Sequence, residues 1–274
     1  MKITKNYHRK IVLLFVLLAI QVSIAFAQNS IQLSVDASDA AKNILHVKET
    51  MSVKSGEFTL YYPKWIPGEH APTGTLNNMV NFFVTANGKA IAWRRDDVDM
   101  FAFHLTIPAN VKQIEITFDD VSEAETTMSA NLARIKWNRL LLYAEGAKSD
   151  DVEVSGSLKM PVGWQYATAL PVPKQDRSTA DSTVSFKTVN LTTFVDSPAI
   201  IGKYFAKVPL LTENGVPHEL DIAADSADAL KYKPETLEGW KNLIKQANLM
   251  FGARHYNSYK FLLTLSDVDR KTHV

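Results

Sequence analysis

The sequence contains no cysteine, which excludes disulfide bonds, a thiol nucleophile and lipid attachment through a cysteine side chain. It has no long hydrophobic run either, because the apolar stretch "IVLLFVLLAI" falls short of the ~20 residues that a membrane-spanning helix needs. A Gly-x-Ser-x-Gly nucleophile elbow and a glycine-rich phosphate loop are also absent. These absences leave no recognisable nucleophile and no nucleotide site.

Positively and negatively charged side chains are nearly equal in number. The 274 residues carry 30 Lys and Arg against 29 Asp and Glu, and removal of residues 1–27 leaves 26 against 29, a net charge of −3. No basic patch indicates nucleic acid as a partner. With 46% hydrophobic and 22% charged residues, the chain is ordinary globular material, long enough for one large domain or two modest ones.

The first 27 residues have the pattern of a secretory signal peptide. Four basic residues precede the apolar run, namely Lys2, Lys5, Arg9 and Lys10. Small residues at Ala25 and Ala27 predict cleavage before Gln28. We therefore expect a periplasmic or extracellular protein with no stable membrane insertion after cleavage; the alternative is a retained membrane anchor.

Most of the mature chain is predicted to form strands. Alternating or β-branched and aromatic segments occupy residues 31–35, 44–50, 58–62, 101–107 and 113–118. Asn87-Gly88, between two such runs, is a strong hairpin signal. Short strands with turn signals at this spacing predict a mainly β fold, with a β-sandwich-like domain over residues 28–210.

The pattern changes after residue 210. "HELDIAA" (residues 218–224) alternates, and "PETLEGWKNLIKQANLMFG" (234–252) predicts an amphipathic helix between Pro234 and Gly252. The apolar stripe of this helix consists of Leu237, Trp240, Ile244, Ala247 and Phe251. A strand, "YKFLLTL", follows at residues 259–265. The order strand, helix, strand predicts that residues 211–274 are the incomplete beginning of a second domain.

The run from Phe261 to Leu265 is nearly continuous in apolar side chains, which predicts a strand that is buried on both faces and has neighbours on both sides. Only nine residues follow Leu265, and they are mostly polar or charged. We therefore expect the layer that covers this strand to be missing. It follows that residues from about 212 onward should be loosely ordered or self-associate, while residues 28–210 fold without them.

Histidine offers one partial metal motif. The seven histidines are His8, His46, His70, His104, His218, His255 and His273. His218-Glu219 begins like the zinc motif H-E-x-x-H, but Ile222 occupies the second ligand position and cannot bind a metal. The segment also reads as the start of a strand. We therefore predict no catalytic, cofactor-binding or metal residue in this chain.

Two other features of the sequence are candidate sites. Asp96, Asp97 and Asp99, with Glu69-His70, could form a metal or acid–base cluster, although solvated turn carboxylates between two strands are the favoured interpretation. The Asn190-Leu191-Thr192 triplet fits the N-glycosylation pattern, which is frequent by chance.

The loop "PKWIPGEHAPTG" (residues 63–74) combines three prolines and two glycines with Trp65. It either caps the sandwich or forms the wall of a cleft, and the sequence does not favour one of these roles.

Five segments in order carry a resemblance to a known family. They are Pro63-x-Trp65-x-Pro67-Gly68, "NGKAIAWRRDDVDMFAFHL" (87–105), "MPVGWQYATAL" (160–170), "FVDSPAIIGKYF" (194–205) and "MFGARHYNSYKFLLTLSD" (250–267). Over nearly the whole mature chain, this pattern resembles the glycyl aminopeptidase family of zinc metallopeptidases.

The resemblance implies an N-terminal β domain packed on a thermolysin-like α+β catalytic domain, of which this chain has the truncated start. In the family, a Gly-Leu-Glu-His segment and an H-E-x-x-H helix follow the "FLLTLSD"-like strand, and the full-length family binds zinc. Here Asp267 leads instead into "VDRKTHV", which departs from the pattern and suggests a frameshift or a truncated gene. No catalytic or metal residue is carried over, and no cofactor is expected in this chain.

Three functions remain open. The favoured one is the N-terminal portion of an exported glycyl aminopeptidase-like zinc peptidase, inactive alone, with the missing catalytic half or a peptide substrate as partner. The second is a secreted β-sandwich binding module for a peptide or glycan, with the loop around Trp65 as its wall. The third is an independent enzyme with an unrecognised site.

Overall fold

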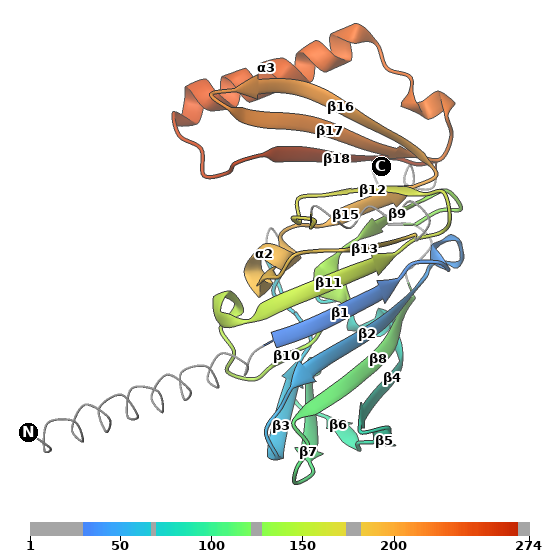
Figure 1. Cartoon of the computed structure of the whole chain (residues 1–274), viewed down its shortest axis with the longest axis vertical. Coiled ribbons are helices and arrows are strands. Elements are labelled where there is room, and N and C mark those ends of the chain that lie inside the picture. The colour runs from blue at the N-terminus through green and yellow to red at the C-terminus, as the bar shows by residue number, and fades with distance from the viewer. Residues whose placement is uncertain (1–29, 67–69, 122–127, 174–181, 268–274) are drawn as a thin grey trace, which may run out of the picture.

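A computed structural model describes residues 30–66, 70–121, 128–173 and 182–267, and strands dominate these residues as predicted. Two parts can be distinguished in Figure 1: a large β region below, and a sheet covered by one long helix above. We call residues 30–203 the β region and residues 204–267 the second region.

The largest sheet of the β region has the strand order β13-β11-β1-β2-β8-β4-β5, with β14 also paired to β11. Its strands are β1 (Ser30–Asp36), β2 (Ile44–Ser52), β4 (Met79–Ala86), β5 (Lys89–Ala90), β8 (Gln113–Val121), β11 (Glu153–Lys159), β13 (Thr183–Ser185) and β14 (Val189–Asn190). The central strands alternate buried and exposed residues, which is why one face of the sheet meets the core and the other meets solvent. All pairs in this sheet are antiparallel except β1 with β11.

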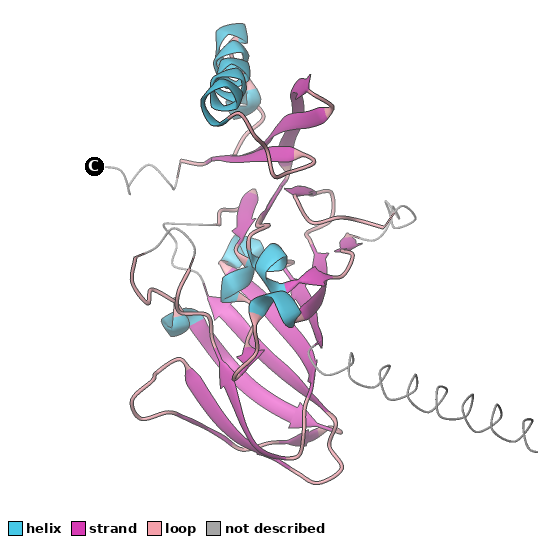
Figure 2. Ribbon diagram, turned by 90° about the vertical axis from the view of Figure 1, so that its left-hand side faces the viewer, coloured by secondary structure: helices cyan, strands magenta, loops and turns pink. Residues whose placement is uncertain are grey.

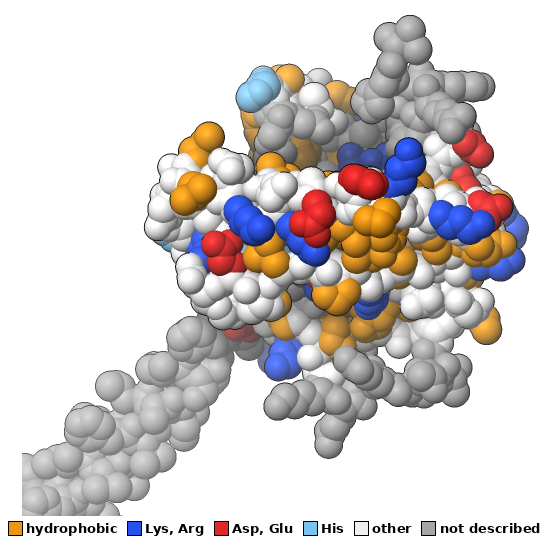
Figure 3. All heavy atoms as spheres, turned by 90° about the horizontal axis from the view of Figure 1, so that it is seen from above, with side chains coloured by type: hydrophobic (Ala, Val, Ile, Leu, Met, Phe, Trp, Pro, Cys, Tyr) orange, Lys and Arg blue, Asp and Glu red, His pale blue; other side chains and the backbone are white. Residues whose placement is uncertain are grey.

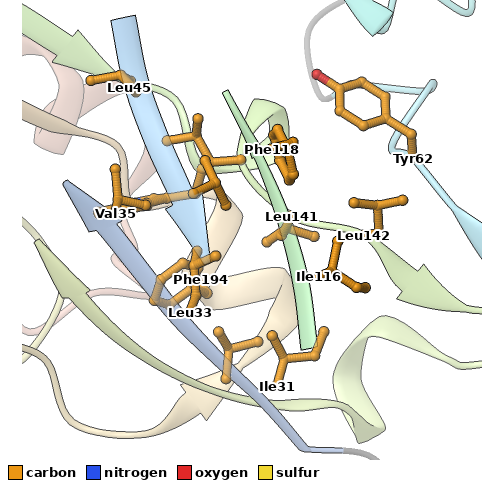
Figure 4. Packing of buried hydrophobic residues seen from close by; sticks show 14 of the residues in the cluster. Ile31, Leu33, Val35, Leu45, Tyr62, Ile116, Phe118, Leu141, Leu142 and Phe194 are labelled. Carbon is orange, nitrogen blue, oxygen red and sulfur yellow. The ribbon is translucent and has the colours of Figure 1, made fainter. Parts of the chain in front are cut away.

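A second sheet completes the sandwich, with the order β10-β3-β7-β6. It contains β3 (Gly56–Tyr61), β6 (Trp93–Arg95), β7 (Ala102–Ile107) and β10 (Tyr143–Ala144). One cluster of buried side chains joins the two sheets, and Figure 4 shows Leu33, Val35, Ile116 and Phe118 in it. The predicted β-sandwich-like architecture is therefore confirmed. Asn87 and Gly88 form the expected tight turn between β4 and β5, with φ of 51° and 73°.

A three-stranded sheet, β12-β15-β9, forms the upper end of the β region. Its strands are β9 (Leu132–Ile135), β12 (Gln165–Thr168) and β15 (Ala199–Gly202). All four residues of β15 are buried, because Ala199 and Ile201 join the sandwich core while Ile200 faces the second region. This sheet therefore links the two cores. The helices of the β region are short: α2 (Leu191–Val195) and four 3₁₀ turns at Ala40–Lys42, Leu76–Asn78, Trp137–Arg139 and Ser149–Asp151.

The second region is one sheet covered by one helix. Its elements are β16 (Tyr204–Glu213), β17 (Val216–Ala224), a 3₁₀ turn at Asp228–Leu230, α3 (Pro234–Phe251) and β18 (Tyr259–Leu265). β16 and β17 are antiparallel, whereas β18 runs parallel to β17 after the crossover through α3. As predicted, Pro234 lies in the first turn of α3, and Gly252 caps its end in the left-handed conformation with φ of 65°.

The sheet of the second region lies between α3 and the β region (Figures 1 and 2). Ile244 of α3 packs with Leu220 and Ile222 on one face of the sheet. On the other face, Ala223 packs with Ile200 and other buried side chains of the three-stranded sheet. No helix within the described ranges is long and apolar enough to cross a membrane.

The expected and the observed second region differ in two respects. Leu210, where the sequence predicts the domain boundary, lies inside β16, whose strand partner among the described residues is β17; this pairing places the break near Lys203. The strand from Phe261 to Leu265, expected to be buried on both faces, is half-buried, because β18 lies at the edge of its sheet and in the described part of the chain pairs with β17. Phe251, the last residue of the expected helix stripe, is 73% exposed.

Candidate functional site

The junction where β17 and β18 end against the β region holds a set of polar contacts between distant segments. Asp225 follows β17, and its carboxylate accepts hydrogen bonds from the hydroxyl of Ser129, the hydroxyl of Ser266 at 2.6 Å and the backbone N–H of Asp267 at 3.1 Å. The amide of Asn131 donates to the backbone carbonyl of Asp225 at 2.8 Å. We call this set the Asp225 clamp, because it ties the ends of both parallel strands to the β region.

A carboxyl pair lies earlier on the same strand. Asp221 is fully buried on the face of β17 that points toward the β region, and Glu219 lies two residues before it. Lys260 of β18 donates to Glu219 at 3.1 Å and to Asp221 at 3.2 Å. A lysine that bridges two carboxyl groups across adjacent strands stabilises the β17–β18 pair.

Burial is the main influence on the pKa of the Asp221 carboxyl group. Loss of solvent, and after it the hydrogen bond with the nearby Glu219, raise the pKa of Asp221 to about 7. The hydrogen bond from Asp221 lowers the pKa of Glu219, and the ion pair with Lys260 acts in the same direction. One of the two carboxyl groups therefore holds a proton near neutral pH. Since Asp221 has no exposed surface, this proton is not available to a ligand in the observed conformation.

The partial zinc motif is part of a strand, as the sequence analysis predicted. His218 and Glu219 are consecutive residues of β17, so their side chains point to opposite faces of the sheet. His218 faces α3 and Glu219 faces the β region. Within the described ranges, no three His, Cys, Asp or Glu side chains gather in a way that could hold a metal ion. The residues described here therefore do not fit a zinc site.

The aspartates after β6 are turn residues. The carboxylate of Asp96 pairs with His104 at 2.8 Å and accepts from the backbone N–H groups of Val98 and Asp99, both at 2.8 Å. These hydrogen bonds, that of His104 first, hold the pKa of Asp96 far below its ordinary value. Asp99 pairs with Lys64 and accepts from the backbone N–H of Phe101. The favoured interpretation of Asp96 and Asp99 as turn carboxylates therefore fits their hydrogen bonds.

The other members of that proposed cluster do not join it. Asp97 and His70 make no contact with Asp96 in the structure that would form a metal site, and His70 is exposed. Glu69 lies outside the described residues.

The loop around Trp65 is anchored at both ends while its tryptophan is exposed. Trp65 pairs with Pro72 in an isolated bridge and is 63% exposed. Gly74 allows the close return of the chain, because a Cβ atom there would lie 2.4 Å from the carbonyl oxygen of Pro63. Lys64 lies over the rings of Tyr61 and Phe101 and is held by its ion pair with Asp99. Residues 67–69 of the loop are outside the described part of the chain.

Asn190, the first residue of the glycosylation triplet, has a structural role. It is the N-cap of α2, where its side-chain oxygen accepts from the backbone N–H of Thr193 at 2.8 Å. The hydroxyl of Thr192 lies 2.8 Å from that of Ser149. Both polar residues of the triplet therefore already have partners within the protein.

Sequence reasoning missed the Asp225 clamp and a buried acid in the sandwich. Glu49 has no exposed surface; one carboxyl oxygen accepts from the backbone N–H of Leu142 at 2.9 Å, and burial raises the pKa of Glu49 to about 8. A signal for it was present, because alternation along β2 places position 49 on the same face as Leu45, Val47 and Met51. The clamp had no such signal, since Ser129 and Asn131 are 96 and 94 positions from Asp225 along the chain, and Ser266 is 41 positions from it.

Comparison with known proteins gives the family. The sequence pattern of the Peptidase M61 N-terminal domain matches residues 32–203, which is most of the β region. No curated protein matches the chain with significance.

Two solved structures are similar to this chain, and the first of them shows its fold. An aminopeptidase N family protein from Idiomarina loihiensis superposes with a TM-score of 0.69 at 17% identity, covering 85% of this chain and 39% of that protein. An M1 zinc metallopeptidase from Deinococcus radiodurans gives a TM-score of 0.47 at 13% identity, with coverages of 86% and 55%. The chain thus spans about two fifths of the length of the first protein, and at this identity the likeness shows the fold alone. The match over residues 32–203 establishes the family: the chain belongs to the Peptidase M61 N-terminal domain family.

Proposed function

We propose that this chain is the N-terminal portion of an exported, glycyl aminopeptidase-like zinc metallopeptidase. The observation that carries the proposal is the family match over residues 32–203, followed by the strands β16 and β17, the helix α3 and the strand β18. The wide coverage of this chain by the aminopeptidase fold from Idiomarina loihiensis supports the same assignment for residues beyond 203.

In this proposal the β region is a platform and does not carry out chemistry. The Asp225 clamp ties the ends of β17 and β18 to Ser129 and Asn131, so Asp267, at the end of the described residues, lies at a defined place beside the β region. The layer of apolar contacts around Ala223 and Ile200 adds a second fixed contact. A catalytic segment that continues from β18 would therefore be oriented by the β region.

We further propose that the 274-residue chain does not hydrolyse peptides alone. It contains no H-E-x-x-H sequence, and a zinc ion needs three or four converging ligands at about 2.0–2.3 Å. Zinc ligands and the residues that recognise the substrate's amino group would have to come from a catalytic half that is not among these 274 residues.

The test is metal analysis and turnover on the purified chain. After dialysis we expect substoichiometric zinc and no hydrolysis of glycyl or alanyl chromogenic substrates. A matched sample with a separately expressed M61 catalytic half should gain turnover that a chelator removes. One tightly bound zinc per chain, with chelator-sensitive turnover in the absence of any added half, would show that the assignment of an inactive N-terminal portion is wrong.

Export is the second part of the proposal. Its support is the signal-peptide pattern of residues 1–27, which lie outside the described residues. Expression with the native N-terminus should give a secreted or periplasmic protein whose intact mass begins at Gln28. Membrane-bound protein that still carries Met1 would overturn this part and leave the family assignment unaffected.

A binding module remains the second candidate, and the outer face of the large sheet favours it. Two adjoining hollows of about 450 and 350 Å³ share Ser34 and Lys48 in their linings, and Phe83 is exposed at the first of them. His46 lies there between Asp119 at 2.7 Å and Asp39 at 3.4 Å, and the hydrogen bond with Asp119 raises its pKa. Such a face could hold a peptide or glycan.

Calorimetric titration with oligosaccharides and short peptides tests this candidate. Saturable binding that Phe83→Ala weakens, with Val162→Ala as a control at another exposed apolar position, would favour the module. If none of these oligosaccharides and peptides binds at millimolar concentrations, the binding-module function is ruled out.

A further inference from the structure

Two Asn-Gly pairs form tight turns between neighbouring strands. Asn87-Gly88 joins β4 to β5, and Asn214-Gly215 joins β16 to β17. In both turns the asparagine and the glycine have positive φ, 51° and 73° in the first turn and 50° and 78° in the second, and all four residues are exposed. The same local chemistry therefore occurs twice, in two different surroundings.

An asparagine that precedes glycine can lose its side-chain amide without an enzyme. The backbone nitrogen of the glycine attacks the side-chain carbonyl carbon of the asparagine. A new C–N bond closes a cyclic imide, the bond to the amide nitrogen breaks, and ammonia leaves with the proton of the glycine nitrogen. Water then opens the imide at either carbonyl carbon, which gives aspartate or isoaspartate. Glycine favours the attack because it has no Cβ atom to shield its nitrogen.

A closed turn slows this attack. The imide forms only after the asparagine backbone rotates so that its side-chain carbon meets the glycine nitrogen. A residue held in the left-handed conformation of a two-residue turn cannot make this rotation while the flanking strands remain paired. The rate in the folded protein therefore depends on how often each turn opens, and the contacts around the turn set that frequency.

The first turn is weakly held. β5 has two residues, both exposed, and lies at the edge of the large sheet, where β4 is its partner among the described residues (Figure 1). Two residue pairs join β5 to β4, and beyond them the backbone N–H of Ile91 donates to the carbonyl of Val84 at 2.8 Å. Opening of this turn therefore breaks few contacts.

The second turn is held firmly from two sides. β16 and β17 share nine residue pairs. Glu213, which directly precedes the turn, accepts a hydrogen bond from Arg254 on its backbone carbonyl at 2.8 Å and another from Asn248 on its carboxylate. Asn248 belongs to the last turns of α3, and Figure 3, which views the molecule from the α3 end, shows hydrophobic side chains gathered between groups of charged ones. Opening of the second turn would therefore also disturb contacts with the end of α3.

We propose that Asn87 is a site of spontaneous deamidation in the folded protein, and that the hydrogen bonds from Arg254 and Asn248 to Glu213 protect Asn214 from the same reaction. The site lies in the β region and does not depend on the peptidase assignment.

The two products should affect the first turn differently. Aspartate fits it, because Asp-Gly is a preferred pair in two-residue turns of this kind. Isoaspartate routes the main chain through the former side chain and adds one carbon atom to the backbone of the turn, so the residue pairs of β5 with β4 no longer match. We expect β5 to detach in that product and Ile91, which is 8% exposed in the observed structure, to become accessible.

The test compares the two asparagines in the same sample. The full chain would be kept at pH 7.5 and 37 °C, and peptide mapping by mass spectrometry would follow deamidation at each position. We expect Asn87 to react at least about tenfold faster than Asn214, which corresponds to a difference of about 1.4 kcal/mol in the free energy of opening. Synthetic peptides of residues 85–90 and 212–217 have no fold, and they should react at similar rates.

One variant tests the source of the protection. Arg254→Ala removes the hydrogen bond to the carbonyl of Glu213, so Asn214 should react about three- to tenfold faster, the effect expected of one hydrogen bond. Asn87 in the same sample is the internal control and should keep its rate. Lys245→Ala removes a cation from an exposed position of α3 and should leave both rates unchanged.

A second variant tests the consequence for β5. Asn87→Gly removes the amide but suits the turn, because Gly-Gly is also a preferred pair. After the same incubation, the amide of Ile91 should exchange with solvent faster in the unchanged chain and at its original rate in Asn87→Gly.

Folding of each variant would be checked by circular dichroism, and the comparison of the unchanged chain with the two peptides decides the matter if Arg254→Ala does not fold. The proposal is overturned if Asn87 and Asn214 react equally fast in the folded chain, or if Asn214 reacts faster. It is also overturned if Asn87 is intact when the peptide of residues 85–90 has reacted completely. Acceleration of both sites in Arg254→Ala would show that Arg254 does not protect Asn214 specifically.

Discussion

The β region and the second region use the same kinds of side chain but bury them to different degrees. In the β region, Trp137, Phe103 and Phe194 are essentially inaccessible to solvent, within one core that extends over both sheets. In the second region the corresponding core has five buried residues, and every residue of β18 is at least partly exposed. Apolar composition alone therefore does not set how firmly a segment is held, because the number of layers that cover it also matters.

The first and largest expected effect is in the sandwich core. Trp137→Ala removes a fully buried ring and its hydrogen bond from Nε1 to the carbonyl of Ser197, which is 2.7 Å long. We expect the free energy of unfolding to fall by about 3–5 kcal/mol, measured by urea denaturation. Trp65→Ala, at an exposed position, is the control and should change it by less than about 0.5 kcal/mol. Equal effects of the two substitutions would mean that the β region is not the stable core of the chain.

The second prediction concerns pH and Glu49. Because the folded pKa of about 8 lies above the unfolded value of 4.5, the folded state holds a proton that the unfolded state loses between these values. Stability from this group is complete below about pH 4.5 and is lost as pH rises toward 8, with a slope of at most about 1.4 kcal/mol per pH unit.

Urea denaturation of Glu49→Gln against the unchanged chain at pH 5, 6.5 and 8 checks this. The neutral side chain keeps the shape and removes the titration, so the variant should become the more stable of the two as pH rises. A difference between the two proteins that is the same at all three pH values would contradict the buried, protonated state of Glu49.

The third prediction separates the two regions. Asp225→Ala removes the hydrogen bonds from Ser129, Ser266 and Asp267, and we expect a cost of about 1–3 kcal/mol that is confined to the second region. Hydrogen exchange should show faster exchange of the β17 and β18 amides, with β1 and β2 unchanged. Asp228→Ala is a matched control, because the Asp228 side chain is 85% exposed. Faster exchange throughout the β region would mean that the two regions unfold together.

The smallest effect is expected at Trp240. This ring packs against Phe261 at 4.8 Å but is only partly buried, so Trp240→Ala should cost about 1–2 kcal/mol, less than half the loss at Trp137. Limited proteolysis should then cut within residues 204–267 before it cuts the β region. If β18 proves as well protected as β1 in the unchanged chain, the contrast between the two regions fails, and so does the expectation that residues from about 212 onward are loosely ordered.

Local patterns predicted the central strands of the large sheet well, because each of them has one face toward the core and one toward solvent. The alternation in residues 31–35 and 44–50 became β1 and β2, and Asn87-Gly88 became the turn between β4 and β5. The ends of α3 were also predictable, since Pro and Gly act through backbone geometry that depends on few neighbours. Pattern was a poor guide to β18, because an apolar run shows what a strand could bury and does not show how many partners it has.

The candidate site was less predictable than the fold. The Asp225 clamp needs residues from three segments that only the tertiary structure brings together. The carboxyl pair with Lys260 likewise depends on the parallel register that places Glu219 beside Lys260. By contrast, the strand assignment of His218-Glu219 required only the alternation of its own segment.

The position of β1 has a consequence for the order in which the chain can fold. This strand lies between β2 and β11, and its parallel pairing with β11 joins residues such as Asp36 and Lys159, which are 123 positions apart. During synthesis, β1 emerges early, and more than a hundred further residues must follow before its second neighbour, β11, is available to pair with it. Long-range closure of this kind is slow, so the unpaired side of β1 is open to mispairing for most of that time. A chaperone that holds the emerging chain extended would act chiefly by protecting this one edge.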